Sequence, residues 1–500
     1  MAKFDRLHPA LDDARLDDWR LMRDCYDGER VVKGRRAVYL PVTSGQYALG
    51  MGTGTNGRTR PGQLLYDAYL ARAAFPEIVH QTISALVGIM VREPWSITLP
   101  DQMDYMHTRA TVRGEPLATL IDRMLAQILL TGRVGLMLDV RAAENELYIA
   151  DYQAHQIINW DDNPIGDLST RRLRLVVLNE SRAERVPGNL GWKAVTIYRA
   201  LTIGGVAALD SPLGVAYTVE IERDDGNTSS VVPMLRGRSL GFVPFTFCNT
   251  SDLVPDPGEI PLIGLARLAM TIYRGEADYR QSLFMQGQDT LVLRGVANPD
   301  AQDVSMSVDG HVPYGGPPQT GSKVVVGAGA VIYLPDPEMS AEFIGVSSTG
   351  IAEQRQAIEN DHRRAEQLGM ALLTSGNQGE AAETLQTRVT ARTASLASIA
   401  RAAGAAIRQQ LQWAAQWHGA DPESVVVEPN IDFIAARMAA SEINEMITAK
   451  VRGFPMSWRS MHRLAEQGDL TMLGFEEELE EIAAEPQIEL ITGVGEDGDQ

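Results

Sequence analysis

The sequence predicts an α+β fold in which helical segments on either side enclose a β-rich middle third. Apolar residues recur at three-or-four spacing in the first 130 residues and again after residue 259, which indicates amphipathic helices. Between residues 131 and 258 the pattern changes to short β-prone runs separated by turn clusters such as 161–164 and 224–227. No helix-length crossovers separate these runs, so we expect the strands to pair antiparallel.

The first 130 residues are expected to form helices interrupted by one long insert. Asp17 and Asp18 precede the apolar positions of the first helix, as acids commonly do at a helix start. Further helical patterns run from Leu64 to about Met90 and from Pro116 to Leu130, where proline suits the first helical turn. Residues 44–62 are rich in Gly, Thr, Asn and Pro and predict a long surface loop.

The β-rich part contains four clear runs. Each is four to eight residues long, apolar or β-branched, and bounded by turn residues: 134–140, 173–178, 194–198 and 217–221.

Long helices dominate the remainder of the chain. One is predicted over 261–288, and short strands and turns follow over 289–346. A second helix, over 349–373, has apolar residues spaced by seven at Ile351, Ile358, Ala365 and Leu372. Such a sparse stripe predicts packing along a narrow seam against other helices. After a break at 374–379, an Ala-rich helix spans 380–417, a short strand spans 424–428, and three small helices fill 435–485.

Composition excludes several classes of protein. The net charge of −20 argues against tight, groove-reading DNA binding, which uses Lys and Arg to neutralise phosphates. It is compatible with a wall along which DNA slides. Two distant cysteines, Cys25 and Cys248, predict free thiols rather than a disulfide scaffold. We expect a soluble intracellular protein, because there is no apolar leader and no apolar run of about 18 residues.

Motifs that carry chemistry are nearly absent. Residues 52–57 match a dinucleotide-binding spacing, but no apolar strand leads into them and Arg58 to Pro61 follow, so we favour a flexible loop. Asp361 and His362 are interpreted as a solvated or interface surface rather than a general base. Asp151, Asp161 and Asp162 could outline a metal site, but a turn is favoured. We therefore expect no catalytic residue, metal or cofactor, and no enzyme activity.

Arginines at one-turn spacing on the Ala-rich helix leave two interpretations open. Arg388 and Arg392, with Arg401 and Arg408 further along, could form a basic stripe near nucleic acid or compensate neighbouring acids. The second is favoured.

The order of these elements resembles the portal proteins of tailed double-stranded DNA bacteriophages. Residues 261–288 are similar to the portal stem helix that leads into the clip, and 17–24, 39–41, 85–94, 132–139 and 152–160 resemble one phage portal subfamily. The resemblance covers about residues 15–485. The long Gly-rich loop at 44–62 departs from the pattern.

The resemblance implies a domain order. It comprises an N-terminal helical wing (1–130), a β-rich wing (131–258), stem helix 1 (259–288), a clip (289–346), stem helix 2 (347–373), a tunnel loop (374–380), a long wing helix (381–420) and a helical crown with an acidic tail (421–500).

It also implies a closed ring, usually of twelve copies, at one capsid vertex of the virion. Such a ring passes double-stranded DNA without sequence specificity during packaging and ejection. Its implied partners are the terminase large subunit, the head–tail adaptor, and the major capsid and scaffolding proteins, and no membrane is involved.

Specific residues follow from this assignment as expectations. Ser375, Asn377 and Gln378 are expected to contact DNA in the tunnel, and Asp303, Asp309, His311 and Tyr314 to form part of the clip surface. The alternatives are another head–tail connector or minor capsid protein, and a nucleotide-binding enzyme that uses the loop at 52–57.

Overall fold

A computed structural model describes most of the chain. The described residues are 4–51, 59–141, 144, 146–162, 172–208, 216–224, 226–286, 290–294, 340–344, 349–369, 382–431, 433, 448, 450, 452, 457–467 and 474–484. They divide into two compact units, residues 1–428 and 429–500. The mixture of helices and antiparallel strands confirms the α+β prediction.

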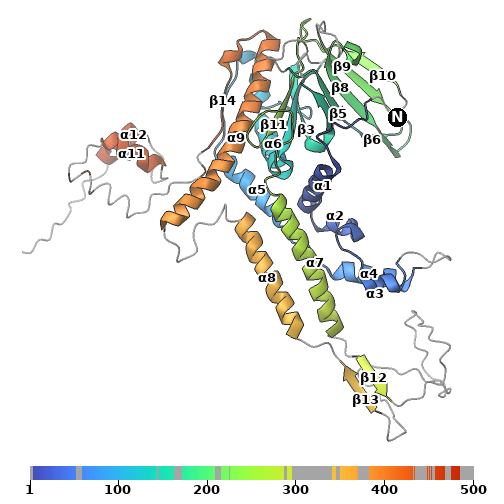
Figure 1. The fold of residues 1–500 in the computed structure, drawn as a ribbon. Helices are drawn as coiled ribbons and strands as arrows, with labels where there is room; N and C mark the ends of the chain where they lie inside the picture. The colour runs from blue at the N-terminus through green and yellow to red at the C-terminus, as the bar shows by residue number, and fades with distance from the viewer. Residues whose placement is uncertain are drawn as a thin grey trace, which may run out of the picture. The chain divides into compact units, whose positions relative to one another are not determined.

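Helices form the start of the first unit (Figure 1). The bounds are α1 Asp13–Asp27, α2 Glu29–Gly34, α3 Ser44–Ala48, α4 Pro61–Arg72, α5 Ile78–Met90 and α6 Leu117–Thr131, with 3-10 turns η1 Arg36–Val38 and η2 Asp101–His107. Helix α6 ends at Gly132, whose φ of +74° is favourable only for glycine and where a Cβ would lie 2.3 Å from the carbonyl oxygen of Glu259. Trp19 of α1 donates a hydrogen bond to the Thr131 carbonyl at 2.9 Å and fixes α1 against this end.

Two antiparallel sheets form the β-rich part. The three-stranded sheet has the order β11-β2-β3, and the five-stranded sheet has the order β10-β9-β8-β5-β4. The bounds are β2 Arg133–Arg141, β3 Glu146–Gln153, β4 Ile157–Asp161, β5 Leu175–Asn179, β8 Ile197–Ile203, β9 Tyr217–Arg223, β10 Thr228–Val231 and β11 Phe245–Asn249; η3 Ala154–Gln156 and η4 Val206–Ala208 are short turns. A separate hairpin pairs β6 Arg182–Arg185 with β7 Trp192–Val195.

Polar and aromatic side chains join the two sheets. Trp160 of β4 meets Phe247 of β11 with ring centroids 6.0 Å apart. Arg199 of β8 forms ion pairs with Asp139 of β2 at 3.0 Å and with Glu180 at 2.9 Å, and Tyr152 of β3 donates to Glu180 at 2.6 Å. Because these groups are largely buried, the paired charges satisfy one another between the sheets.

Helix α9, Ala382–His418, packs against the three-stranded sheet and α6. Its contact face consists mainly of alanine, which lets the helix approach the strands closely. Gln410 is fully buried there and donates to the Leu136 carbonyl at 3.1 Å and to the Thr246 hydroxyl at 2.8 Å. The short strand β14, Val426–Glu428, follows α9 and pairs with β1, Ser96–Thr98, which joins segments far apart in sequence.

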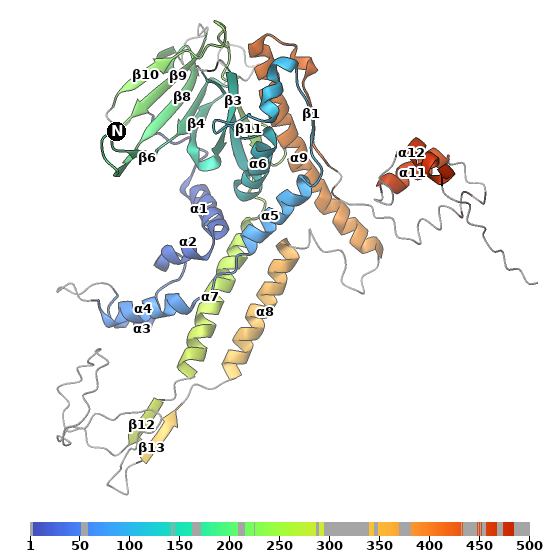
Figure 2. The same ribbon diagram turned by 180° about the vertical axis from the view of Figure 1, so that it is seen from behind.

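Helices α7, Ile263–Gln286, and α8, Thr349–Gly369, lie side by side in opposite directions, as Figures 1 and 2 both show. The strands β12, Thr290–Arg294, and β13, Ser340–Ile344, form an antiparallel pair next to them in sequence. In the second unit the described helices are α11, Trp458–Gln467, and α12, Phe475–Ala484; the 3-10 turn η6, Pro422–Ser424, belongs to the first unit.

Three local predictions are wrong. Part of the predicted loop at 44–62 is helix α3, because Thr43 and Gln46 form a capping box. The helix predicted over Leu64–Met90 is two helices, α4 and α5, separated at 73–77, where Pro76 interrupts the pattern. The strand predicted over 194–198 is divided between β7 and β8, which belong to different sheets.

Candidate functional site

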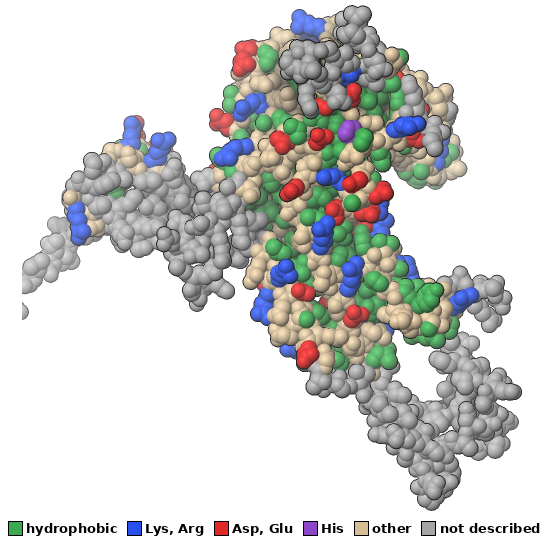
Figure 3. Space-filling model, viewed as in Figure 1, with side chains coloured by type: hydrophobic (Ala, Val, Ile, Leu, Met, Phe, Trp, Pro, Cys, Tyr) green, Lys and Arg blue, Asp and Glu red, His purple; other side chains and the backbone are tan. Residues whose placement is uncertain are grey.

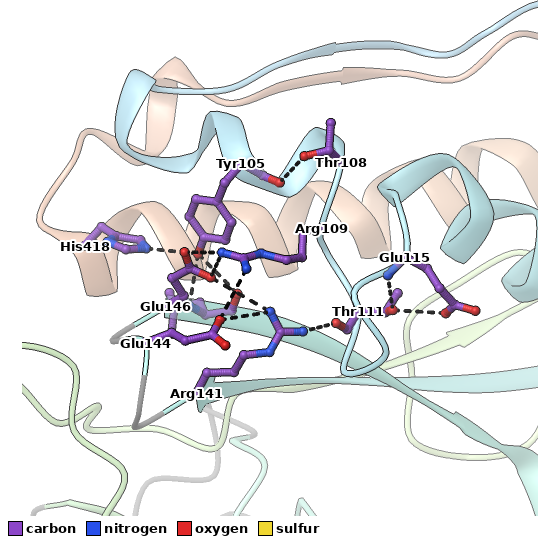
Figure 4. Close-up of polar contacts among 10 residues, drawn as sticks. Tyr105, Thr108, Arg109, Thr111, Glu115, Arg141, Glu144, Glu146 and His418 are labelled. Carbon is purple, nitrogen blue, oxygen red and sulfur yellow. Dashed lines mark hydrogen bonds and ion pairs between the residues drawn. The ribbon is translucent and has the colours of Figure 1, made fainter.

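A cluster of polar side chains fastens the segment that follows η2 to the β2–β3 hairpin (Figure 4). Arg109 donates to both carboxylate oxygens of Glu146 at 2.5 and 2.6 Å, and Arg141 donates to the Thr111 carbonyl. Arg123 bridges Glu115 at 2.9 Å and Asp151 at 2.8 Å. Hydrogen bonds from Arg123 and Thr111 hold the pKa of Glu115 below its usual value. These acids are ion-paired, so the cluster acts as a structural fastening rather than as a source of general bases.

His418, at the end of α9, contacts the same cluster. Its Nε2 lies 3.4 Å from the Tyr105 hydroxyl, and burial lowers the pKa of the imidazole. Its role is to join α9 to η2.

Arg133 lies fully buried in a stack of rings. Its guanidinium carbon is 4.3 Å from the Trp160 ring and 4.5 Å from the Phe247 ring, and His8 stacks on Trp160 at 3.8 Å. None of its side-chain nitrogens has a hydrogen-bond acceptor among the described residues. Burial lowers the pKa of the guanidinium, which is held by cation–π contacts.

The two cysteines are free and buried, as the sequence predicts. Burial raises the pKa of Cys25 to about 12 and raises that of Cys248 further, so neither thiol is activated. Within the described part of the chain, no group of three His, Cys, Asp or Glu residues could hold a metal ion, and Asp151 is paired with Arg123. No helix among the described residues is long and apolar enough to cross a membrane.

The paired helices α7 and α8 are long, and contacts within this chain leave a large part of their surface exposed. At 1.5 Å per residue, α7 is about 36 Å long and α8 about 32 Å long. The first two thirds of α7 are anchored, since Leu265, Ala269, Ile272 and Tyr273 are buried against α1, α4 and α5. Beyond Ala277 no described residue of α7 is buried, and Leu283, Phe284 and Met285 are 42%, 39% and 49% exposed.

Most described side chains of helix α8 are exposed to solvent. Of its described side chains only Ile358 and Ala365 are buried, and Ile351 is half-buried, so three of the four positions of the predicted seam face α7. The fourth, Leu372, lies outside the described residues. At Gly275 of α7 a Cβ would lie 3.3 Å from Cγ1 of Ile358, which shows how closely the two helices approach. Most of the described side chains of this 21-residue helix are therefore exposed.

Helix α4 braces the far part of α7. The Tyr69 hydroxyl donates to Asp278 at 2.5 Å, and Arg72 donates to Gln281 at 2.6 Å while its guanidinium carbon lies 3.9 Å from the Phe284 ring. Exposed apolar residues lie on α3, on α4 and between them: Tyr47, Leu49, Leu64 and Leu65. Figure 3 shows hydrophobic side chains gathered on this arm.

The paired helices carry almost balanced charge. Together α7 and α8 contain six Lys or Arg and six Asp or Glu. Several are paired along the helix surface, such as Arg280 with Glu276 at 2.7 Å and Arg355 with Glu359 at 3.0 Å. The acidic excess lies outside these two helices. Residues 429–500 hold fifteen Asp or Glu and five Lys or Arg, and so carry half of the net charge of −20.

Most predicted site residues fall outside the described residues. This holds for Ser375, Asn377 and Gln378, for Asp303, Asp309, His311 and Tyr314, and for the loop at 52–57. Arg388 and Arg392 belong to α9, but the description there covers the helix and not their side chains. Arg408, from the same stripe, donates to the Val427 carbonyl at 2.6 Å and so fastens β14. Arg401 is exposed.

Comparisons with known proteins give limited matches. A family described as "Domain of unknown function (DUF4055)" matches residues 261–418, from the start of α7 to the end of α9. No curated protein sequence matches.

Among solved structures, the chain is similar to one from the neck of a native GTA particle computed with C12 symmetry. That likeness has 14% identity, a TM-score of 0.37, and coverage of 77% of this chain and 89% of that one. A chain from the neck of an empty GTA particle computed with C6 symmetry has 13% identity, a TM-score of 0.36, and coverage of 86% and 98%. A third, from the virion of a native gene transfer agent (GTA) particle, has 14% identity, a TM-score of 0.37, and coverage of 84% and 98%. TM-scores this low do not establish a shared fold.

Two features were missed in the sequence. Arg133 gave no signal, because a lone arginine before a strand is ordinary, and only the rings from distant segments make its position unusual. The exposed hairpin β6–β7 was hidden because its second strand and β8 were predicted as one run. The signal in the sequence that could have indicated this separate strand was Trp192, an apolar residue next to Lys193.

Proposed function

We propose that this chain is the portal subunit of a tailed bacteriophage or related particle, which forms a ring at one vertex of the capsid. DNA passes through the ring during packaging and ejection. The ring contacts the terminase motor and the tail adaptor through residues 289–346 and is assembled with the major capsid and scaffolding proteins. Twelve copies are the number that the sequence resemblance implies.

The observation that carries the proposal is the exposed surface of α8 and of the last turns of α7. In an isolated chain, a helix with two buried side chains has too little burial to be stable, since helices in proteins gain most of their stability from tertiary packing. In a closed ring, each subunit presents one side to the next, and heterologous contacts cover both sides of every pair. The same contacts would cover Leu283, Phe284 and Met285 at the end of α7.

Charge supports the same function. A near-neutral pair of helices and an acidic second unit would not grip phosphates through counterion release, so DNA could slide along them. The acids of the paired helices are balanced by bases, and residues 429–500 carry half of the net charge of −20.

A packaging experiment tests the proposal. Deleting residues 374–379, the proposed tunnel loop, is expected to leave ring assembly intact and to impair packaging or retention of DNA. Particles assembled with the deletion variant would be compared with wild-type particles for nuclease-protected DNA. Normal DNA content would contradict the assignment of that loop, and absence of the protein from purified particles would contradict the function itself.

A further inference from the structure

The hairpin β6–β7 is an exposed ribbon with apolar side chains at its tip. Leu190 is 85% exposed and Trp192 is 69% exposed, and of residues 182–194 only Glu184 and Val186 are even half-buried. A two-stranded ribbon is marginally stable in water without a further surface to pack on. The hairpin extends from the adjacent ends of β5 and β8, and Glu184 forms an ion pair with Arg223 of β9 at 3.4 Å.

A large cavity lies at another side of the same unit. It has a volume of about 1030 Å³, and its walls come from β11, the C-terminal half of α9 and the segments 238–243 and 253–256. Phe242 and Trp413 form an aromatic pair there, with ring centroids 5.1 Å apart, and both are only half-buried. Cavities lined by aromatic side chains with a few polar groups are typical docking sites for an aromatic anchor.

A chain cannot fill this cavity with its own hairpin. The cavity runs along β11, an edge strand of its sheet, and reaches Asp162 just beyond β4, the edge strand of the other sheet. The hairpin continues from the adjacent ends of β5 and β8, and its Glu184 reaches Arg223 of β9. In both Figure 1 and Figure 2, β6 lies on the side of the β-rich part away from α9.

One wall of the cavity carries a charge opposite to the charges near the hairpin tip. Arg185, paired with Trp192 in the strand register, and Lys193 form no ion pair with a described residue. The cavity wall contains Asp256, whose carboxylate likewise has no cation within ion-pair distance among the described residues. Arg172 and Arg238 also line the cavity, so the match concerns the Asp256 wall and not the whole lining.

We propose that the hairpin of one subunit inserts Trp192 and Leu190 into the cavity of the next subunit of the same protein. Each subunit then offers one hairpin and one cavity, which is the head-to-tail contact that closes a ring. This inference rests on the proposed function, because a closed ring is what brings unlike sides of identical chains together.

Two variants remove the contact from opposite sides. The double substitution Leu190→Ala with Trp192→Ala removes the anchor, and Gly241→Phe fills the cavity, since a Cβ at Gly241 meets no atom within 4 Å. Loss of a central tryptophan anchor is expected to weaken association by about 30-fold or more per contact. Trp192→Phe and Gly34→Phe are matched controls, because the first keeps an aromatic anchor and the second adds a ring at an equally open glycine outside the cavity.

Mixing the variants gives the sharpest readout. Each variant alone is expected to remain a monomer by mass photometry, and its β-rich part is expected to stay folded by circular dichroism. An equimolar mixture is expected to form pairs and no larger species, because only the intact hairpin of the Gly241→Phe chain can enter the intact cavity of the other. Rings formed by either variant at the wild-type concentration would overturn the proposal.

An engineered cross-link separates this contact from the ring itself. A chain with Leu190→Cys and Gly241→Cys is expected to give a ladder of disulfide-linked oligomers under oxidising conditions, since Cys25 and Cys248 are buried and unreactive. Wild-type rings without any such ladder would overturn the hairpin contact and leave the portal function standing. A ladder from the double-cysteine chain, combined with a wild-type chain that forms no rings, would support the contact and count against the portal function.

Discussion

At the scale of single residues, two buried tyrosines differ in whether their hydroxyl groups have a hydrogen-bond partner. Tyr152 and Tyr217 lie in the same region between the sheets, and both are buried. The Tyr152 hydroxyl donates to Glu180, whereas the Tyr217 hydroxyl has no partner among the described residues. Removing a bonded hydroxyl loses its hydrogen bond, while removing an unbonded one relieves a desolvated group.

The two tyrosines therefore make a matched pair of substitutions. Tyr152→Phe is expected to lower the free energy of unfolding by about 1–2 kcal/mol, and Tyr217→Phe to leave it unchanged or raise it by up to about 1 kcal/mol. Chemical denaturation of the two variants measures the difference. Equal destabilisation by both would contradict the hydrogen-bonding described here.

Buried tyrosines also set the response of stability to alkaline pH. Burial raises the pKa of Tyr152 and Tyr148 well above the ordinary value, and that of Tyr273 to about 12. Below about pH 10 both folded and unfolded chains keep these protons, so the contribution is constant. Above it, only the unfolded chain releases them, and the free energy of unfolding is expected to fall. Denaturation midpoints at pH 9 and pH 11 test this; an unchanged midpoint would contradict the burial.

At the scale of elements, the contact between α7 and α8 is narrow enough for one residue to control it. Ile358 occupies the centre of the seam opposite Gly275, and Ala357 beside it is exposed. Arg355, Arg363 and Arg364 place trypsin sites along α8. The state of the helix can therefore be measured by the rate of cleavage.

Ile358→Asp is expected to detach α8, because an unpaired carboxylate would be placed in an apolar seam. Cleavage by trypsin within α8 should become at least several times faster, and assembly into rings should be lost. Ala357→Asp, one residue away on the exposed surface, is the control and should behave like wild type. Equal resistance of both variants to trypsin would show that the seam does not hold α8.

The elements also show what the sequence can and cannot predict. Heptad spacing located the α8 seam at Ile351, Ile358 and Ala365, because helical periodicity is local information. Three features were not predicted because each depends on a single residue inside a run of similar composition. They are the capping box at Thr43, the break before α5 and the boundary at Thr196. The β1–β14 pairing and the cavity walls join residues more than 100 positions apart, which no local pattern encodes.

At the scale of the whole molecule, the net charge and the packed elements are distributed differently over the two units. The net charge of −20 is carried equally by residues 1–428 and by the much shorter 429–500. Unit 1 contains both sheets, α9 and the paired helices, so it holds the elements on which ring assembly depends in this account.

A truncated chain of residues 1–428 is accordingly expected to fold and to assemble. Its net charge of −10 predicts tighter non-specific binding of DNA than the full chain at low salt, and the difference should disappear as ionic strength rises. Fluorescence anisotropy with a random duplex at 50 and 200 mM salt measures it. Identical affinity of the two chains at 50 mM salt would contradict a repulsive role for residues 429–500.

The most direct test of the account is the particle formed by the purified full-length protein. Mass photometry combined with negative-stain imaging is expected to find closed rings of about a dozen subunits with a central hole, in which α7 and α8 of neighbouring subunits cover one another. A folded species of one or two chains at every concentration up to tens of micromolar would contradict it, because the bare surface of α8 would then be stable without neighbours.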